Sequence, residues 1–264
     1  MPSAAGIVLA GGRSSRMGSP KAALEWHGST LLRRACGLVG RGVDGPVVVV
    51  RAPGQELPPL PAAVAVAEDA RQGRGPLQAL SAGLAAVEDR APVAYLSSTD
   101  APLLHPAFVR HVVAALDDDA DVVLPHARGF PQPLAAAYRT SLRARLDDLL
   151  AAGRVRPADL FATCRVRDLD EGALLADPAL AAADPALDSV VNLNEPTEYE
   201  AARARPAPEV TVERPGPTTV RAATLGAAAA AAGIALGEQV ALNGLAVEPD
   251  PELPLVAGDT VALR

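Results

Sequence analysis

Short apolar runs alternate with longer amphipathic segments through the first part of the chain. The short runs are rich in β-branched residues or end at glycine or acidic residues, which predicts strands at 6–10, 46–50, 64–67, 93–97 and 121–124. Apolar residues at helical spacing predict helices at 31–39, 76–87, 106–116 and 142–151. Strands that alternate with helices predict an α/β fold, in which helices flank both faces of a mainly parallel sheet.

Three polar loops follow predicted strands and mark one edge of this sheet. Gly11 follows the first predicted strand, Asp69 the third and Asp100 the fourth. Ligands of parallel sheets bind beyond the carboxyl ends of the strands. We therefore expect the three loops to line one crevice.

The pattern changes near Arg203. Residues 204–208 are rich in proline, which is typical of a linker, so we predict one domain at 1–203 and a second at 209–264. The second domain shows, in order, a strand at 209–213, a helix at 224–232, a strand at 239–242, a turn at 243–244 and a strand at 260–263. This order predicts a compact β-α-β-β unit.

Composition narrows the class of protein. The 264 residues are 49% hydrophobic, and no run reaches the roughly 18 apolar residues of a membrane span. We find no signal peptide, and Cys36 and Cys164 form neither a disulfide framework nor a zinc pattern. We expect both thiols to be buried and the protein to be cytoplasmic. The net charge of −7 argues against nucleic acid as a partner.

The loop after the first predicted strand is rich in glycine and positive charge. It runs Leu9-Ala10-Gly11-Gly12-Arg13-Ser14-Ser15-Arg16-Met17-Gly18-Ser19-Pro20-Lys21. Glycines let backbone N–H groups approach phosphate oxygens, and the cations add fixed charge. The spacing is neither that of a Walker A loop nor that of a dinucleotide-binding turn. Lys21 is the one lysine among 24 basic residues, which indicates that this position needs a compact ammonium group.

Asp100 is a candidate ligand for Mg²⁺. It follows a predicted strand and precedes Ala101-Pro102, which would hold its carboxylate at the rim of the sheet. Mg²⁺ is typically bound by one or two carboxylates together with phosphates and water. Lys21, Arg16 and Mg²⁺ could stabilise the charge that develops on an α-phosphate and on leaving pyrophosphate. The histidines show no ligand spacing, and we interpret them as surface or structural residues: His27, His105, His111 and His126.

Five motifs occur in an order that resembles one protein family. They are Leu9–Lys21, Glu68-Asp69 with Gly75-Pro76-Leu77, Ser98–Pro102, Pro131–Leu134 with Tyr138, and Val191–Pro196 with Glu198. Together they resemble the molybdenum cofactor guanylyltransferases, which are MobA-like nucleotidyltransferases. The resemblance implies a Rossmann-like fold of the nucleotide-diphospho-sugar-transferase type.

The resemblance also implies roles for particular residues. It assigns catalysis to Arg16, Lys21 and Asp100, with Mg²⁺ held by Asp100. It assigns nucleotide or substrate binding to Leu9, Ala10, Gly11, Gly12, Lys21, Asp69, Gly75, Pro76, Gln132, Pro133, Asn192 and Asn194. Asn192 and Asn194 are two residues apart on an extended segment, so both amides should face the same way and could hydrogen-bond a base or pterin edge.

The implied reaction is transfer of GMP from GTP to a molybdopterin-type cofactor, giving a guanine dinucleotide cofactor and pyrophosphate. Gly11-Gly12 favours guanine, whereas Arg51 stands where many guanylyltransferases have a small polar residue. One alternative is a cytidylyltransferase that uses the same acceptor. Another is a sugar- or polyol-phosphate nucleotidylyltransferase, against which residues 192–196 argue. A third is a non-catalytic nucleotide-binding protein, against which Lys21 and Asp100 argue.

The C-terminal unit resembles a different family. Residues 240–244 and 257–261 are similar to the small β-grasp sulfur carriers MoaD and ThiS of molybdopterin and thiamin synthesis. Those carriers work through a C-terminal Gly-Gly tail, whereas this chain stops at Leu263-Arg264, so we expect no sulfur transfer. The unit has seven acidic residues and three arginines. We expect its acidic face to bind another protein of the cofactor pathway; the alternative is a unit that only covers the catalytic domain.

Overall fold

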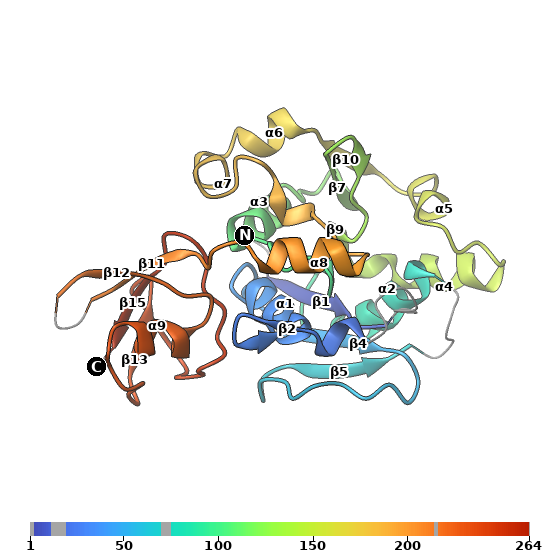
Figure 1. Cartoon of the computed structure of the whole chain (residues 1–264). Coiled ribbons are helices and arrows are strands. Elements are labelled where there is room, and N and C mark those ends of the chain that lie inside the picture. The colour runs from blue at the N-terminus through green and yellow to red at the C-terminus, as the bar shows by residue number, and fades with distance from the viewer. Residues whose placement is uncertain (1–2, 12–19, 70–74, 214–215, 264) are drawn as a thin grey trace.

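The protein consists of a larger α/β body and a smaller, mainly β unit that lies beside it (Figure 1). The computed structural model describes residues 3–11, 20–69, 75–213 and 216–263. Gly12, Arg13 and Arg16 lie outside the described residues, as does Arg264.

The main sheet has the strand order β10-β7-β9-β6-β1-β4-β5, with β8 paired to β7. Its strands are β1 (Ala4–Leu9), β4 (Val47–Arg51), β5 (Ala65–Glu68), β6 (Val93–Ser98), β7 (Val122–Ala127), β8 (Phe130–Pro131), β9 (Ala135–Arg139) and β10 (Val166–Leu169). Neighbours on the main path pair in parallel except at β9, which is antiparallel to both β6 and β7. The prediction of a mainly parallel sheet is confirmed.

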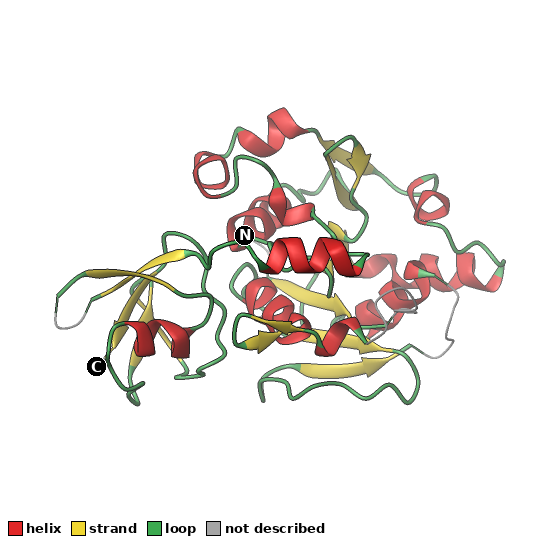
Figure 2. Ribbon diagram, viewed as in Figure 1, coloured by secondary structure: helices red, strands yellow, loops and turns green. Residues whose placement is uncertain are grey.

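Helices cover both faces of this sheet (Figure 2). One face packs against α1 (Leu31–Gly40), α3 (Pro106–Ala114), α6 (Glu171–Leu175) and α7 (Pro178–Ala183). The other packs against α2 (Pro76–Ala85), α4 (Arg143–Ala151) and α5 (Pro157–Phe161). The remaining elements of the body are α8 (Pro196–Arg203), the hairpin strands β2 (Glu25–Trp26) and β3 (Ser29–Thr30), and the 3-10 turns η1 (Lys21–Ala23), η2 (Thr140–Leu142) and η3 (Asp188–Val190).

Local sequence explains where the helices beside the crevice begin. The hydroxyl of Thr30 accepts a hydrogen bond from the backbone N–H of Arg33 at 3.2 Å and so caps α1. Helix α2 begins at Pro76, whose fixed φ suits a first helical turn. The preceding Gly75 has φ 83° and ψ −179°, a conformation open essentially to glycine alone. Gly75 therefore allows the sharp entry into α2 at the rim of the sheet.

The C-terminal unit has its own sheet and core. Its elements are β11 (Glu209–Val212), β12 (Thr218–Arg221), α9 (Leu225–Ala231), β13 (Val240–Leu242), β14 (Leu245–Val247) and β15 (Thr260–Leu263). The strand order is β12-β11-β15-β13-β14, in which only the β11–β15 pair is parallel among the described residues. The β-α-β-β order expected from the sequence did not include β12 and β14, which the structure adds. Both are short edge strands that expose most of their residues, so neither shows a clear apolar alternation.

Part of the acidic face of this unit is used within the chain. Asp250 Oδ2 lies 2.7 Å from Arg33 Nη2 on α1, and Asp259 Oδ1 lies 2.6 Å from Nη2 of Arg41, the residue directly after α1. Glu252 also pairs with Arg33. These three carboxylates are therefore paired within the chain, and binding of another protein by the acidic face stays a prediction.

Cys36 is part of the core and His105 caps a helix, so both have structural roles. Cys36 is buried, and burial raises the pKa of its thiol to about 12, whereas Cys164 is only partly buried, contrary to our expectation. His105 Nδ1 accepts from the N–H of Ala107 and caps α3.

None of the helices in the described residues has the length and apolar character needed to cross a bilayer.

Candidate functional site

A cavity of about 720 Å³ opens at the carboxyl edge of the main sheet. It is lined by the ends of β1, β4 and β6 with the loops that follow, by the residue after β5, by the start of α2, and by the segments before β9 and α8. The lining residues are Leu9, Ala10, Gly11, Lys21, Val50, Arg51, Ala52, Asp69, Gly75, Pro76, Ala79, Ser98, Thr99, Asp100, Leu134, Asn192 and Asn194. The predicted convergence of the loops at Gly11, Asp69 and Asp100 is confirmed. The volume lies within the range of typical ligand sites.

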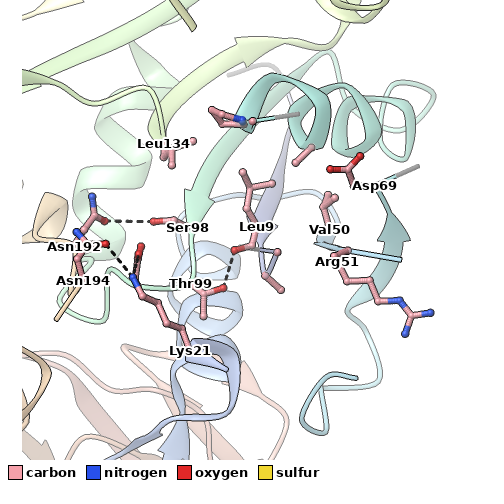
Figure 3. A pocket seen from close by; sticks show the side chains of 17 residues that line it. Leu9, Lys21, Val50, Arg51, Asp69, Ser98, Thr99, Leu134, Asn192 and Asn194 are labelled. Atoms are coloured by element: carbon pink, nitrogen blue, oxygen red, sulfur yellow. Dashed lines mark hydrogen bonds and ion pairs between the residues drawn. The ribbon is translucent and has the colours of Figure 1, made fainter. Parts of the chain in front are cut away.

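Lys21 and Asp100 form an ion pair in this cavity (Figure 3). Lys21 Nζ lies 2.7 Å from Asp100 Oδ2 and donates a second hydrogen bond to Asn194 Oδ1 at 3.0 Å. The side chains of Lys21 and Asp100 are 19% and 18% exposed, so both remain accessible to a ligand. The ammonium group of Lys21 and the carboxylate of Asp100 thus lie side by side, and each can bind a ligand in place of the other.

The backbone around Asp100 is held by two other motifs. Thr99 donates to the carbonyl of Leu9 through both its N–H, at 3.3 Å, and its hydroxyl, at 2.8 Å. The carbonyl of Asp100 accepts from the N–H of Leu193 at 2.9 Å. The end of β1 and the segment before α8 therefore hold the backbone from which the Asp100 carboxylate extends to Lys21.

Asn192 and Asn194 both face the cavity, as their spacing predicted. Ser98 Oγ donates to Asn192 Oδ1 at 3.4 Å, and Asn194 contacts Lys21 (Figure 3). The carboxylate of Glu198 accepts from the backbone N–H groups of Asn194 and Glu195. These hydrogen bonds hold the pKa of Glu198 below its usual value and tie the asparagine segment to the start of α8.

Gln55, which sequence reasoning missed, does not line the cavity but hydrogen-bonds two residues that do. Gln55 Nε2 donates to the carbonyl of Ala10 at 2.9 Å, and its Oε1 accepts from the N–H of Ala52 at 3.0 Å. Arg51 donates to the carbonyl of Gln55 and pairs with Glu68 at 3.1 Å. Gln55 lies in an irregular segment without periodicity, so nothing in the sequence pattern marks it.

Two predicted substrate residues lie away from the main cavity. Gln132 lines a small neighbouring cavity that shares Leu134 and Asn192 with the larger one. Its amide donates to the backbone carbonyls of Ala127 and Phe130. Pro133 lines neither of these two cavities, and its carbonyl accepts from the Tyr138 hydroxyl at 2.7 Å.

The donor set of the crevice limits the kind of metal it can hold. Within the described residues, no cluster of three His, Cys, Asp or Glu side chains could bind a metal ion by itself. A metal at Asp100 must therefore take most of its ligands from phosphate and water. This arrangement fits Mg²⁺, which keeps several waters and binds one or two carboxylates and substrate phosphates.

Comparisons with known proteins agree with this geometry. Residues 6–164 match the protein family described as the MobA-like NTP transferase domain. A probable molybdenum cofactor guanylyltransferase from Mycobacterium ulcerans is 44% identical over 162 residues, which are 60% of this chain and 79% of that protein. A protein of the same name from Mycobacterium tuberculosis is 44% identical over 153 residues, which cover 56% and 74% of the two chains.

Solved structures share the fold at lower identity. Molybdopterin-guanine dinucleotide biosynthesis protein A from Archaeoglobus fulgidus has a TM-score of 0.57 at 19% identity, over 75% of this chain and 96% of its own. A nucleotidyl transferase from Methanothermobacter has a TM-score of 0.55 at 20% identity, over 76% and 96%. The sequence match covers more than half of the chain, including Lys21 and Asp100. The chain therefore belongs to the family of MobA-like NTP transferase domains.

Proposed function

We propose that the protein is a guanylyltransferase that moves GMP from GTP to the phosphate of a molybdopterin-type cofactor, giving a guanine dinucleotide cofactor and pyrophosphate. The observation that carries the proposal is the Lys21–Asp100 pair in the cavity of a MobA-like NTP transferase domain. The names of the relatives from two mycobacteria support guanine as the base and the molybdenum cofactor as the acceptor.

The residues of the crevice suit a direct displacement. An oxygen of the acceptor phosphate attacks the α-phosphorus of GTP, and the bond between that phosphorus and the bridging oxygen to the β-phosphorus breaks as pyrophosphate leaves. A phosphate monoester is already ionised near neutral pH, so no side chain has to remove a proton. Lys21 can turn from Asp100 to the phosphates and stabilise the charge on the leaving pyrophosphate.

Asp100 is the residue that would hold Mg²⁺. Bound there, the ion would neutralise charge on the phosphate oxygens during transfer. Asn194 orients Lys21 through the hydrogen bond to its ammonium group. The nucleotide would contact the backbone of Leu9, Ala10 and Gly11, which line the cavity. The glycine-rich loop would add Gly12 and Arg16, which lie outside the described residues.

The remaining lining residues divide into two sides. Asp69, after β5, and Gly75 and Pro76, at the start of α2, would form the side that binds the base and ribose. Asn192, with Gln132 and Pro133 in the neighbouring segment, belongs to the acceptor side. Figure 3 supports this division, since Lys21 lies beside Asn192 and Asn194 while Asp69 lies on the other side of the cavity.

The same proposal includes the division of the chain. Residues 1–203 form the nucleotidyltransferase domain, 204–208 the linker and 209–264 a β-grasp domain. Three features of the last unit support the β-grasp assignment: a central parallel pair β11–β15, antiparallel hairpins on both sides, and a single helix, α9, among its described residues.

Pyrophosphate release tests the proposed reaction. Purified protein is incubated with Mg²⁺, molybdopterin and each of the four ribonucleoside triphosphates in turn. We expect release with GTP only when the acceptor is present. Equal release with CTP would support the cytidylyl alternative, and release with a sugar phosphate but not with molybdopterin would contradict the proposed acceptor.

A further inference from the structure

Helix α1 connects the crevice to the C-terminal unit. At its N-terminal end it packs against η1, which begins at Lys21, and against the hairpin β2–β3. Arg33 and Arg34 on the helix, and Arg41 directly after its end, contact the C-terminal unit. Gly37 on the same helix permits close approach, since a Cβ there would come within 2.5 Å of the Pro254 ring.

Arg34 differs from the other two arginines because it is buried and has no carboxylate partner among the described residues. It is 6% exposed. Its Nε donates to the carbonyl of Pro102 at 2.6 Å, and its Nη1 donates to the carbonyl of Ala223 at 3.3 Å. Burial, with the nearby charge of Arg41, lowers the pKa of Arg34 to about 10, so the group is still protonated at neutral pH.

These two carbonyls belong to different parts of the protein. Pro102 lies two residues after Asp100, in the turn that leads out of β6. Ala223 lies two residues before α9 in the C-terminal unit, and its carbonyl also accepts from the N–H of Leu255 at 2.9 Å. One guanidinium therefore joins α1, the Asp100 turn and the C-terminal unit.

A buried guanidinium in this position couples the groups that it bridges. Losing either carbonyl would leave a charged donor without a partner in a dry environment, which costs more than a neutral hydrogen bond. The other side of the turn is packed, since Leu103 contacts the apolar cluster of Trp26, Leu31 and Leu193. The turn is thus held between this cluster and Arg34.

We propose that Arg34 is a positioning residue for the Asp100 turn, and that the C-terminal unit keeps it in place through the Ala223 carbonyl. The inference rests on the proposed role of Asp100 in metal binding. It makes the 209–263 unit part of the framework of the catalytic site, and it explains why three arginines on α1 and at its C-terminal end attach the unit.

The test compares three variants of the full chain. Arg34→Lys keeps the charge but cannot reach both carbonyls with a planar fork. Arg41→Gln loosens the C-terminal unit at Asp259 without touching the Asp100 turn. Arg139→Lys is the matched control, because Arg139 likewise bridges two backbone carbonyls, those of Ala120 and Asp117, far from the crevice.

Two measurements are made on each variant. Hydrogen–deuterium exchange reports the protection of segment 99–104, where the amides of Thr99 and Leu104 donate to backbone carbonyls. Mn²⁺ binding in the presence of a non-hydrolysable GTP analogue reports the metal site. We expect Arg34→Lys to speed exchange of this segment and weaken Mn²⁺ binding by about threefold to tenfold. Arg41→Gln should do the same to a smaller extent, and Arg139→Lys should change neither.

The proposal is overturned if folded Arg34→Lys shows wild-type exchange at 99–104 and wild-type Mn²⁺ affinity. If Arg34→Lys does not fold, the test rests on Arg41→Gln. The proposal is also overturned if hydrogen exchange in Arg41→Gln is faster in 209–263 but unchanged at 99–104. The exchange measurement needs no turnover. A wild-type protein that releases no pyrophosphate would therefore refute the proposed function separately from this coupling.

Discussion

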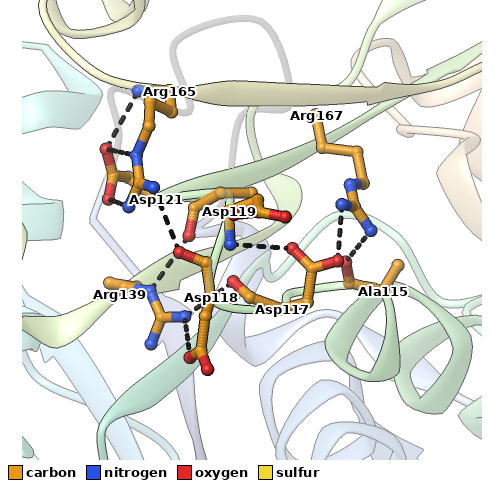
Figure 4. Close-up of polar contacts among 9 residues, drawn as sticks. Ala115, Asp117, Asp118, Asp119, Asp121, Arg139, Arg165 and Arg167 are labelled. Carbon is orange, nitrogen blue, oxygen red and sulfur yellow. Dashed lines mark hydrogen bonds and ion pairs between the residues drawn. The ribbon is translucent and has the colours of Figure 1, made fainter.

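The two edges of the main sheet both carry clustered charge, but they use it differently. At the carboxyl edge, Lys21 and Asp100 meet in a cavity of about 720 Å³. At the opposite edge, Asp117, Asp118 and Asp121 meet Arg139, Arg165 and Arg167 (Figure 4). The second cluster has more charges, yet neither of the two cavities described above includes any of its residues.

The charges of the opposite edge are arranged to neutralise one another. Arg165 pairs with both oxygens of Asp121 through its side chain and also donates its backbone N–H to Asp121. These hydrogen bonds hold the pKa of the Asp121 carboxyl below its usual value. The cluster joins the starts of β7 and β10 to the end of β9. A dense cluster of charges therefore does not by itself indicate a ligand site. An ion pair that lines a cavity, where each group can bind a ligand instead, does indicate one.

The largest expected effect is that of Asp100→Asn. Removing the carboxylate charge should lower Mg²⁺-dependent turnover by about 100-fold to 1,000-fold while folding stays nearly intact. Steady-state rates across a magnesium titration measure the effect. Asp121→Asn at the opposite edge is the matched control and should retain wild-type turnover. Comparable activity of Asp100→Asn and wild type at every magnesium concentration would refute a metal role.

Lys21→Arg should have the next largest effect. The charge is kept, but a planar guanidinium cannot occupy the place of an ammonium that contacts both Asp100 and Asn194, so we expect kcat to fall by about 10-fold to 100-fold. Arg165→Lys, the reverse exchange at the opposite edge, serves as control. The comparison between the edges fails if both variants turn over like wild type.

Base preference should be a smaller effect. We expect kcat/KM for GTP to exceed that for CTP by about tenfold or more, because a site built to hydrogen-bond one base leaves polar groups unpaired with another. Direct competition between the two nucleotides measures the ratio. A ratio near one would remove guanine specificity but leave the nucleotidyltransferase assignment intact.

The smallest effect should come from the ion pairs of the opposite edge. Arg165 is 58% exposed on its side chain, so Arg165→Lys should change the free energy of unfolding by less than about 1 kcal/mol. Urea denaturation of the variant and of wild type measures the difference. A much larger loss of stability would show that this cluster does more than join neighbouring strands.

Much of the α/β body was predictable because its strands and helices are long and regular. The run Val47–Arg51 and the helix Leu31–Gly40 have clear apolar patterns, and both occur close to their predicted bounds. Strand β10 and helices α5, α6 and α7 were not predicted, since each is short and partly exposed.

The site was predictable where chemistry is local in sequence. Lys21 and Asp100 stand out by residue type and by their positions after strands, and they come together as expected. The partners of Arg34 could not be predicted, because Pro102 and Ala223 approach it only through tertiary packing. For the same reason the acidic residues at 250–259 suggested an external partner, although the arginines that pair with them lie on α1 and directly after it in the same chain.

The most direct test of the account follows the α-phosphate itself. GTP labelled at the α-phosphorus is incubated with Mg²⁺, molybdopterin and either wild-type protein or Asp100→Asn, and the products are separated and identified by mass. The account predicts that wild type moves the label into a molybdopterin dinucleotide and that Asp100→Asn leaves it in GTP. Label released by wild type as free GMP, or recovered entirely as GTP, would contradict it.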